Sequence, residues 1–184
     1  MSLINKFFSI SKNLEDKSSS FENLKKTKAI LQLFSAIESY SENSEVRYVG
    51  GCVRKALNNE VLDDIDLAVN LKPNECIEAL NNNNIKFYET GIKHVTITAI
   101  INNHKFEITS LRKDLNTDGR HAEVSFSEDW HVDASRRDFT INSIYADING
   151  NLFDPFDGKE DLENGKINLL EILKKELKKI ILGY

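Results

Sequence analysis

Residues 49–66 read V-G-G-C-V-R-K-A-L-N-N-E-V-L-D-D-I-D, and this stretch decides the fold that we expect. An apolar strand, Val46–Val49, runs into the paired glycines Gly50 and Gly51. A short helix that carries Arg54 follows, and a second strand then begins. Glycines have no side chain, so the backbone can turn tightly there and approach a ligand closely. The stretch therefore predicts a strand–turn–helix–strand unit with a ligand at the turn.

The second strand carries two carboxylates with one residue between them. Side chains at i and i+2 of a strand lie on the same face, so Asp64 and Asp66 project together while Ile65 points to the buried side. Two such carboxylates repel each other unless a cation lies between them. Mg²⁺ prefers hard oxygen ligands of this kind, together with oxygens of a substrate phosphate. Because Arg54 and the helix start also favour an anion, the arrangement is typical of a phosphoryl-transfer enzyme.

A second cluster, R-R-D-F-T-I-N at residues 136–142, adds further charge. Arg136 and Arg137 suit triphosphate oxygens, because guanidinium groups have forked geometry and permanent charge; Asn142 closes this cluster. Taken alone, either cluster also fits an ordinary turn or a solvated surface. Glu107, on a later strand, is either a solvent-facing residue or a third carboxylate that acts as general base on an attacking hydroxyl.

The composition is that of one ordinary globular domain. The chain has 184 residues, of which 40% are hydrophobic and 29% charged. No apolar run reaches the roughly 20 residues that span a bilayer, and residues 1–10 do not resemble a signal peptide, so we expect a cytoplasmic protein that binds no membrane. The net charge of −5 argues against a broad basic surface but leaves room for one basic groove. Cys52 and Cys76 form no disulfide framework, and four scattered histidines argue against a zinc site.

The apolar pattern predicts an alternation of helices and strands. A polar lead-in covers residues 1–23, and helical spacing of apolar residues covers Leu24–Tyr40. The remaining expected elements are a strand at Val46–Val49, a helix at Arg54–Asn58, a strand at Ile65–Val69, a helix at Pro73–Leu80, a hairpin of Val95–Ile101 and Lys105–Leu111, a mobile polar loop at Arg112–Asp129 that includes Asp118, Gly119 and Arg120, a helix at Ser135–Ala146, a turn within Asp147–Phe153 and a loop at Asp154–Gly158. This order predicts an α/β (α+β) fold with a small mixed or antiparallel sheet and helices packed on it.

Six motifs in order resemble those of one enzyme family. They are V-G-G-C-V-R at residues 49–54, D-D-I-D-L-A at 63–68, F-E-I-T-S-L-R at 106–112, D-G-R-H-A-E-V at 118–124, R-R-D-F-T-I-N-S-I at 136–144 and D-P-F-D-G-K-E-D-L at 154–162. The chain resembles the head domain of the class II tRNA nucleotidyltransferases (CCA-adding enzymes) and bacterial poly(A) polymerases. The resemblance covers roughly residues 46–166 and implies a head domain of the polymerase-β type over residues 24–168.

The resemblance also implies an activity and roles for particular residues. Members of the family add CMP and AMP from CTP and ATP to a tRNA 3′ end, or AMP alone in the poly(A) branch, and release pyrophosphate. Their Mg²⁺ is held by the D-x-D pair, here Asp64 and Asp66. By motif position, Gly51 and Arg54 would contact the nucleotide and Arg137, with Arg136, the triphosphate.

Three departures from the family pattern leave an alternative function open. Lys55 stands where the family has aspartate, and Val95 stands where it has glycine. The family's neck, which selects the base through an E-D-x-x-R motif, is replaced here by an atypical tail at residues 169–184. A neck-like sequence can be written in another frame of 170–184 with permitted codons, so we hypothesise a frameshift just before Leu170, which the coding DNA would test.

The lost neck makes us expect weak turnover and poor base discrimination. A catalytically silent remnant that binds Mg-nucleotide is the alternative to the enzyme, and a separately encoded C-terminal half is a third possibility.

Overall fold

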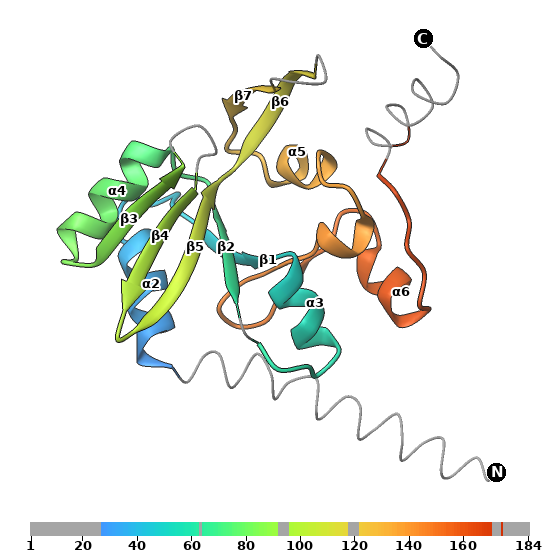
Figure 1. Ribbon diagram of the computed structural model, residues 1–184, viewed down its shortest axis with the longest axis horizontal. Coiled ribbons are helices and arrows are strands. Elements are labelled where there is room, and N and C mark those ends of the chain that lie inside the picture. Colours follow the sequence, from blue (N-terminus) through green and yellow to red (C-terminus); the bar gives the residue numbers. More distant parts are fainter. Residues whose placement is uncertain (1–26, 63, 92–95, 118–121, 171–173, 175–184) are drawn as a thin grey trace, which may run out of the picture.

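The computed structural model describes residues 27–62, 64–91, 96–117, 122–170 and 174, and its main feature is a seven-stranded sheet (Figure 1). The strand order is β3-β4-β5-β2-β1-β8-β9. These strands are β1 (Val46–Val49), β2 (Ile65–Val69), β3 (Lys86–Gly91), β4 (Thr96–Ile101), β5 (His104–Ser110), β8 (Tyr145–Ala146) and β9 (Leu152–Phe153). All neighbours pair antiparallel except β2 and β5, which run parallel. The predicted α+β architecture is confirmed.

Three helices cover one face of this sheet: α2 (Lys28–Glu38), α3 (Gly51–Leu57) and α4 (Pro73–Asn82). The apolar side of α2 is fully buried, and alternate residues of the central strands meet it from the sheet. Burying such side chains contributes about 1.5–3 kcal/mol for each large residue. The largest fully buried side chains of this main core include Phe34, Ile30, Leu33, Ile37, Tyr48, Leu67, Leu80, Ile108 and Ile144.

The other face of the sheet is covered only in part, by the segment around α5 (Trp130–Ser135). Trp130 packs edge-on against Tyr145 of β8, with ring centroids 5.4 Å apart. Val49 and Ala68, which alternate with main-core residues on β1 and β2, join this second core. Among the residues that the structure describes, no helix is long and apolar enough to cross a membrane.

Several predicted elements are confirmed with shifted ends. The long amphipathic helix runs from Lys28 to Glu38, the proline-initiated helix continues to Asn82, and the hairpin forms from β4 and β5. The short helix after the glycines begins at Gly51, not at Arg54 as predicted. The predicted lead-in at 1–23, Val95 and most of the tail at 169–184 lie outside the described residues.

The predicted polar loop at Arg112–Asp129 is wrong. Two strands, β6 (Arg112–Thr117) and β7 (Ala122–Phe126), pair antiparallel in a separate two-stranded sheet. Backbone hydrogen bonds between two strands do not need an apolar face, so a polar composition conceals such a pair. The predicted loop residues Asp118, Gly119 and Arg120 lie outside the described residues.

The predicted helix at Ser135–Ala146 is also wrong. Helix α5 ends at Ser135, a single 3₁₀ turn, η1, covers Thr140–Asn142, and β8 follows. Phe139 is extended and forms an isolated antiparallel bridge with Leu169. Tertiary pairing thus overrides local helical preference here. Two further elements, β3 and α6 (Gly158–Glu163), were not predicted from the sequence, and β9 forms where only a turn was expected.

Candidate active site

The turn between β1 and α3 depends on one glycine. Gly50 has φ 69° and ψ −125°, a conformation that residues with a side chain avoid. A Cβ at Gly50 would lie 3.7 Å from Nη1 of Arg137. A Cβ at Gly51 would meet no atom within 4 Å, so the protein itself leaves open space there. Gly50 is therefore required by the backbone, whereas the lack of a side chain at Gly51 leaves room beside the turn.

The three predicted carboxylates are brought to one place by β2 and β5. Asp64 is exposed just before β2, Asp66 is half-buried within it, and Glu107 is the register partner of Asp66 on β5. Register partners of adjacent strands project to the same face, so Glu107 and Asp66 lie side by side. Burial, followed by the charges of Glu107 and Asp64, raises the pKa of Asp66. This side of the site therefore holds mutually repelling negative charge.

Oxygen donors of this kind fit Mg²⁺, although the described part of the chain contains no group of three or more His, Cys, Asp or Glu side chains placed to hold a metal by themselves. Asp64 and Asp66 could thus contribute two ligands, and the rest would come from water or from substrate phosphate. Burial and then the charges of Glu107 and Asp64 disfavour the charged form of Asp66, and a bound cation would offset both effects.

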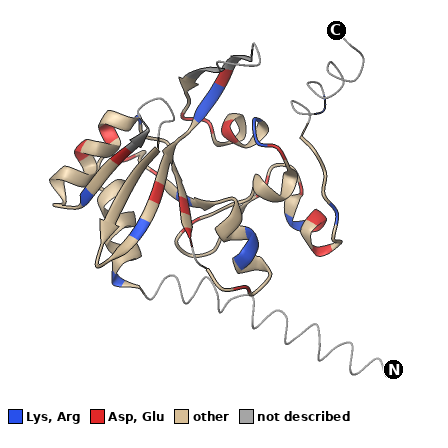
Figure 2. Cartoon of the chain, viewed as in Figure 1, with Lys and Arg blue, Asp and Glu red and all other residues tan. Residues whose placement is uncertain are grey.

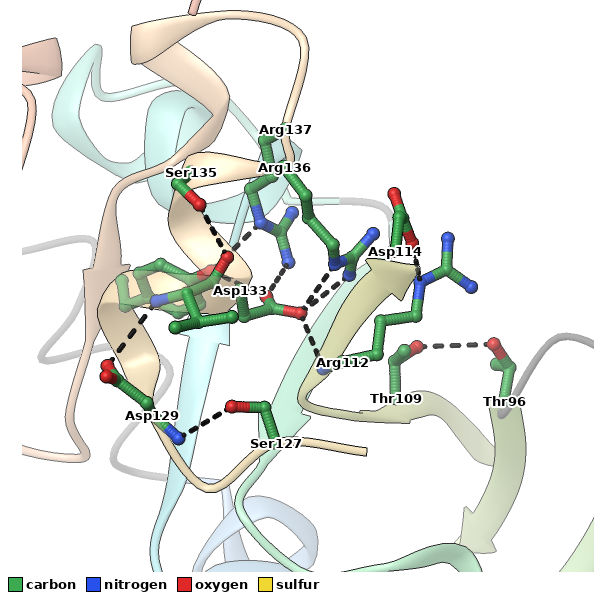
Figure 3. A network of polar contacts seen from close by, with 12 residues as sticks. Thr96, Thr109, Arg112, Asp114, Ser127, Asp129, Asp133, Ser135, Arg136 and Arg137 are labelled. Carbon is green, nitrogen blue, oxygen red and sulfur yellow. Dashed lines mark hydrogen bonds and ion pairs between the residues drawn. The ribbon is translucent and has the colours of Figure 1, made fainter. Parts of the chain in front are cut away.

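The paired arginines are held by a buried carboxylate that the sequence analysis missed (Figure 3). Asp133 is only 1% exposed. Its Oδ1 accepts hydrogen bonds from Nε and Nη2 of Arg136 at 2.9 and 2.7 Å, and its Oδ2 accepts one from Nη2 of Arg137 at 3.2 Å. Burial opposes the charge of Asp133, but Arg137 and Arg136 outweigh it and lower the pKa of this carboxyl.

Two further groups complete this network. The hydroxyl of Tyr145 donates to Oδ2 of Asp133 at 2.6 Å and accepts from Nε of Arg137 at 3.0 Å. The backbone N–H of Arg112 donates to Oδ1 of Asp133 at 3.2 Å, which joins β6 to α5. The spacing of Asp133, Arg136 and Arg137 at i, i+3 and i+4 was the available signal for this contact, because such residues meet on one side of a helix.

The guanidinium of Arg137 reaches one more group, since its Nη1 donates to the backbone carbonyl of Asn142 at 3.4 Å. The side chain of Asn142 accepts a hydrogen bond from Nη1 of Arg54. The predicted residues Arg54, Arg137 and Asn142 thus form one connected group, although they come from α3, the segment after α5 and η1.

These groups line one open cavity of about 530 Å³, a size typical of small-molecule sites. Seven of the predicted site residues line it: Gly50, Gly51, Arg54, Asp66, Arg136, Arg137 and Asn142. Asp64 and Glu107 neighbour Asp66 in the chain and across the strand pair. Lining residues that the sequence analysis had not selected are Val49, Leu67, Thr96, Thr109, Arg112 and Asp138.

Among these additional residues, Arg112 adds another cation and the threonines add hydroxyl groups. The pKa of Arg112 is lowered by burial and then by the charge of Arg136. Thr96 and Thr109 lie opposite each other on β4 and β5, with their hydroxyl oxygens 3.2 Å apart. The cavity therefore has a carboxylate side, formed by Asp66 of β2 with Glu107 of β5 beside it, and a cationic side around the end of α5. Such a pair of sides suits a metal-bound polyphosphate.

The two cysteines are buried packing residues, although Cys52 follows Gly51 and its Sγ also donates to the backbone carbonyl of Asp66 at 3.4 Å. Both Cys52 and Cys76 are buried and free. Burial raises the pKa of Cys52 to about 11, so the thiol stays protonated at neutral pH. Its Sγ donates to the backbone carbonyl of Val49 at 3.2 Å, which is consistent with a packing role.

A comparison of the sequence with models of known protein families finds one match that includes most of the residues of this site. The family model of the poly(A) polymerase head domain matches residues 46–168. The chain belongs to this family. All six motifs, which span residues 49–162, lie within the matched residues, and the predicted family is confirmed.

Curated relatives of this head domain are tRNA nucleotidyltransferases. The human "CCA tRNA nucleotidyltransferase 1, mitochondrial" is 44% identical over 151 residues, which cover 82% of this chain and 34% of that protein. The CCA-adding enzyme of Lactobacillus johnsonii is 38% identical over 121 residues, or 65% of this chain and 29% of that enzyme. The chain thus spans about a third of the length of the curated relatives that it matches.

A solved structure shows the same fold. The Bacillus stearothermophilus CCA-adding enzyme in complex with CTP superposes with a TM-score of 0.69 and 26% identity, over 84% of this chain and 36% of that one. The structural similarity extends over most of the described head domain.

Proposed function

We propose that the chain is the catalytic head of a nucleotidyltransferase that transfers CMP and AMP from CTP and ATP to a tRNA 3′ end. The observation that carries this proposal is the single cavity that joins Gly50, Arg54, Arg137 and Asp66. One side of it carries cations fixed in place, and the other carries carboxylates that repel one another. A triphosphate with a bound Mg²⁺ presents the complementary charges.

Each residue then has a distinct part in the reaction. Asp64 and Asp66 would hold Mg²⁺, which neutralises charge on the phosphates when it is bound. Arg137 and Arg136 would bind triphosphate oxygens, with Asp133 keeping both guanidinium groups in position. Glu107 would accept the proton from the attacking 3′-hydroxyl. Positioning and charge stabilisation would carry most of the rate, as is general for phosphoryl transfer.

The substrates are proposed from the names of the relatives. Curated relatives are called CCA-adding or CCA tRNA nucleotidyltransferases, and the neighbouring structure contains CTP. AMP addition alone is the second candidate, because the matching family model is described as a poly(A) polymerase head domain. A catalytically silent Mg-nucleotide binder is the third, since Lys55 lies half-buried on α3 where the family has aspartate.

Two predictions about the surroundings of the protein are untested. A cytoplasmic location stays a prediction, and one similar human protein is named as mitochondrial. A separately encoded C-terminal half likewise stays a prediction.

The test is incorporation of labelled CTP and ATP into a tRNA that lacks its 3′ CCA. The purified chain is assayed with and without Mg²⁺, and Asp64→Ala/Asp66→Ala is the control variant. We expect Mg²⁺-dependent incorporation that falls at least about 100-fold in the control, as is usual when an electrostatic group of a transfer site is removed.

The ratio of the two nucleotides separates the candidates. Incorporation of both supports CCA addition, and incorporation of ATP alone supports the poly(A) branch. Absence of incorporation, combined with Mg²⁺-dependent CTP binding that the control variant loses, would contradict the enzyme and support the silent binder.

A further inference from the structure

The carboxylates of the candidate site belong to a row of side chains that continues across the sheet, away from the cavity. Asp66 on β2 is the register partner of Glu107 on β5, Glu107 pairs with Thr98 on β4, and Thr98 pairs with Tyr88 on β3. Register partners share a face, so this row lies on the face opposite the main core. Adjacent strands are about 4.8 Å apart, which places Tyr88 roughly 14 Å from Asp66.

Tyr88 has an unusual environment for an aromatic residue. It is 62% exposed, whereas Tyr48 and Tyr145 are buried in the two cores. Exposure of an aromatic ring to water is unfavourable, and stacking of a flat apolar group on the ring is favourable. Its place at the end of the carboxylate row suggests a ligand that also reaches those carboxylates.

Two lysines lie on the same face as the ring, one on the same strand and one two strands away. Lys86 precedes Tyr88 by two residues on β3 and pairs with Ile100 on β4, and Ile100 pairs with Lys105 on β5. Lys86 and Lys105 are exposed and Ile100 is half-buried. Figure 2 shows basic segments on β3 and β5 near one end of the sheet, beside the acidic segments of β5 and β2. The face thus combines an aromatic ring, an apolar side chain and two positive charges.

We propose that this face, formed by Tyr88, Ile100, Lys86 and Lys105, binds the single-stranded 3′ end of the acceptor RNA just before its terminal nucleotide. A base stacks on the ring of Tyr88, and the lysines contact phosphates. Single-stranded nucleic acids are bound by this combination of aromatic stacking and positive charge. The inference rests on the proposed function, because the terminal 3′-hydroxyl would then lie at Asp66 and Glu107.

The strand register explains how one face of the sheet can both bind the RNA strand and place its 3′ end at the carboxylates. The row of register partners runs directly from the ring of Tyr88 to the carboxylates. Lys86 and Lys105 lie two residues before Tyr88 and Glu107 on the same strands. An extended RNA strand that crosses β4 and β5 would therefore place a base at Tyr88 while its end reaches the carboxylates. The bound RNA is held by its backbone and by stacking, so this face would bind different base sequences similarly.

The experiment measures binding of a short single-stranded RNA that carries 2-aminopurine near its 3′ end. The fluorescence of this base falls when it stacks on an aromatic ring, so the signal reports stacking and requires no turnover. We compare the full chain with Tyr88→Ala, Tyr88→Phe and Lys86→Ala/Lys105→Ala. Leu31→Ala is the matched control, because Leu31 is a 45% exposed apolar residue on α2, on the opposite side of the sheet.

We expect Tyr88→Ala to raise the Kd for the RNA about tenfold and to remove most of the quenching, within the usual range for loss of one base–aromatic stack. Tyr88→Phe keeps the ring and should bind as the wild type does. The plot of log K against log salt concentration has a negative slope, and Lys86→Ala/Lys105→Ala should make it shallower by about 1.4, the value for two phosphate contacts to a single strand. Leu31→Ala should change neither signal.

Unchanged affinity and quenching in Tyr88→Ala would overturn the proposal, as would the absence of RNA binding by the wild-type chain. Neither result depends on the proposed function, which is tested by Mg²⁺-dependent nucleotide incorporation. If Tyr88-dependent RNA binding occurs but the incorporation assay fails, the transfer activity is wrong and the RNA site stands. If incorporation occurs while Tyr88→Ala leaves its KM for RNA unchanged, the RNA site is wrong and the activity stands.

Discussion

The two sides of the candidate cavity hold their charges in opposite ways. On the cationic side, Arg136 and Arg137 share a buried carboxylate, Asp133, and the pKa of that carboxyl is lowered. On the carboxylate side, burial and the neighbouring charges of Glu107 and Asp64 raise the pKa of Asp66. The protein stabilises charge on the first side and disfavours it on the second.

This difference indicates what each side contributes. The cationic side is completed within the protein, so its arginines are already oriented before a ligand arrives. The carboxylate side is stabilised when a bound cation relieves the repulsion between its carboxylates. Neutralising one carboxylate on each side should therefore change the free energy of unfolding in opposite directions.

The largest expected effect is on the cationic side, from Asp133→Asn. The variant keeps the shape of the side chain but leaves two arginines and the Tyr145 hydroxyl without their common charged acceptor. Breaking a buried ion pair in this way costs about 3–5 kcal/mol. Guanidinium chloride unfolding measures the loss.

Asp129→Asn is the matched control for this variant, because Asp129 caps the same helix from an exposed position. Asparagine caps helices about as well as aspartate, so the control should unfold with wild-type stability. Equal stability of Asp133→Asn and Asp129→Asn would contradict the comparison.

A smaller effect is expected at the turn between β1 and α3, from Gly50→Ala. Its φ of 69° with ψ of −125° is a conformation that alanine adopts only with strain, which costs on the order of 1–3 kcal/mol. Thermal or denaturant unfolding would report this loss.

Gly51→Ala is the internal control for the turn. Its added Cβ has open space, so the free energy of unfolding should stay within a few tenths of a kcal/mol of wild type. If both variants were equally destabilised, the positive φ at Gly50 would not be the reason that the turn needs glycine.

The smallest effect, and the one of opposite sign, is expected from Asp66→Asn in the absence of Mg²⁺. Removing the charge ends the cost of burying it and relieves repulsion with Glu107 and Asp64, and solvent screening limits the gain to under about 1 kcal/mol. Mg²⁺ should then stabilise the wild type but not the variant, because only a ligand that binds the folded state raises stability. A variant that is less stable than wild type without Mg²⁺ would contradict the comparison.

The pH dependence of these two variants provides a second measurement of the same contrast. The folded-state pKa of Asp66 is raised, so its charge costs stability as pH rises, and the gain from Asp66→Asn should vanish at acidic pH, where the carboxyl is protonated. The folded-state pKa of Asp133 is lowered, so its contribution is present above the unfolded pKa of about 3.9 and is lost as pH falls through the folded value. The loss caused by Asp133→Asn should shrink only below about pH 4.

Sequence patterns predicted the carboxylate side better than the cationic side. The glycine turn and the Asp64/Asp66 pair lie within one continuous stretch, and the short-range rules of turns and strands apply there directly. The helix predicted across Ser135–Ala146 was wrong because Phe139 pairs with Leu169 and Tyr145 joins the sheet. Those pairings connect distant parts of the chain, so no local pattern reveals them.

The sequence by itself determined the elements whose physics is local. Gly50 permits a backbone angle closed to other residues, the period of two places Asp64 and Asp66 on one face, and apolar spacing defines the buried side of α2. Only the tertiary structure decided that β2 pairs in parallel with β5, which brings Glu107 beside Asp66, and that Asp133 is buried between two arginines and Tyr145. The reason is that strand pairing and burial depend on which distant surfaces exclude water together, and this is a property of the whole packed chain.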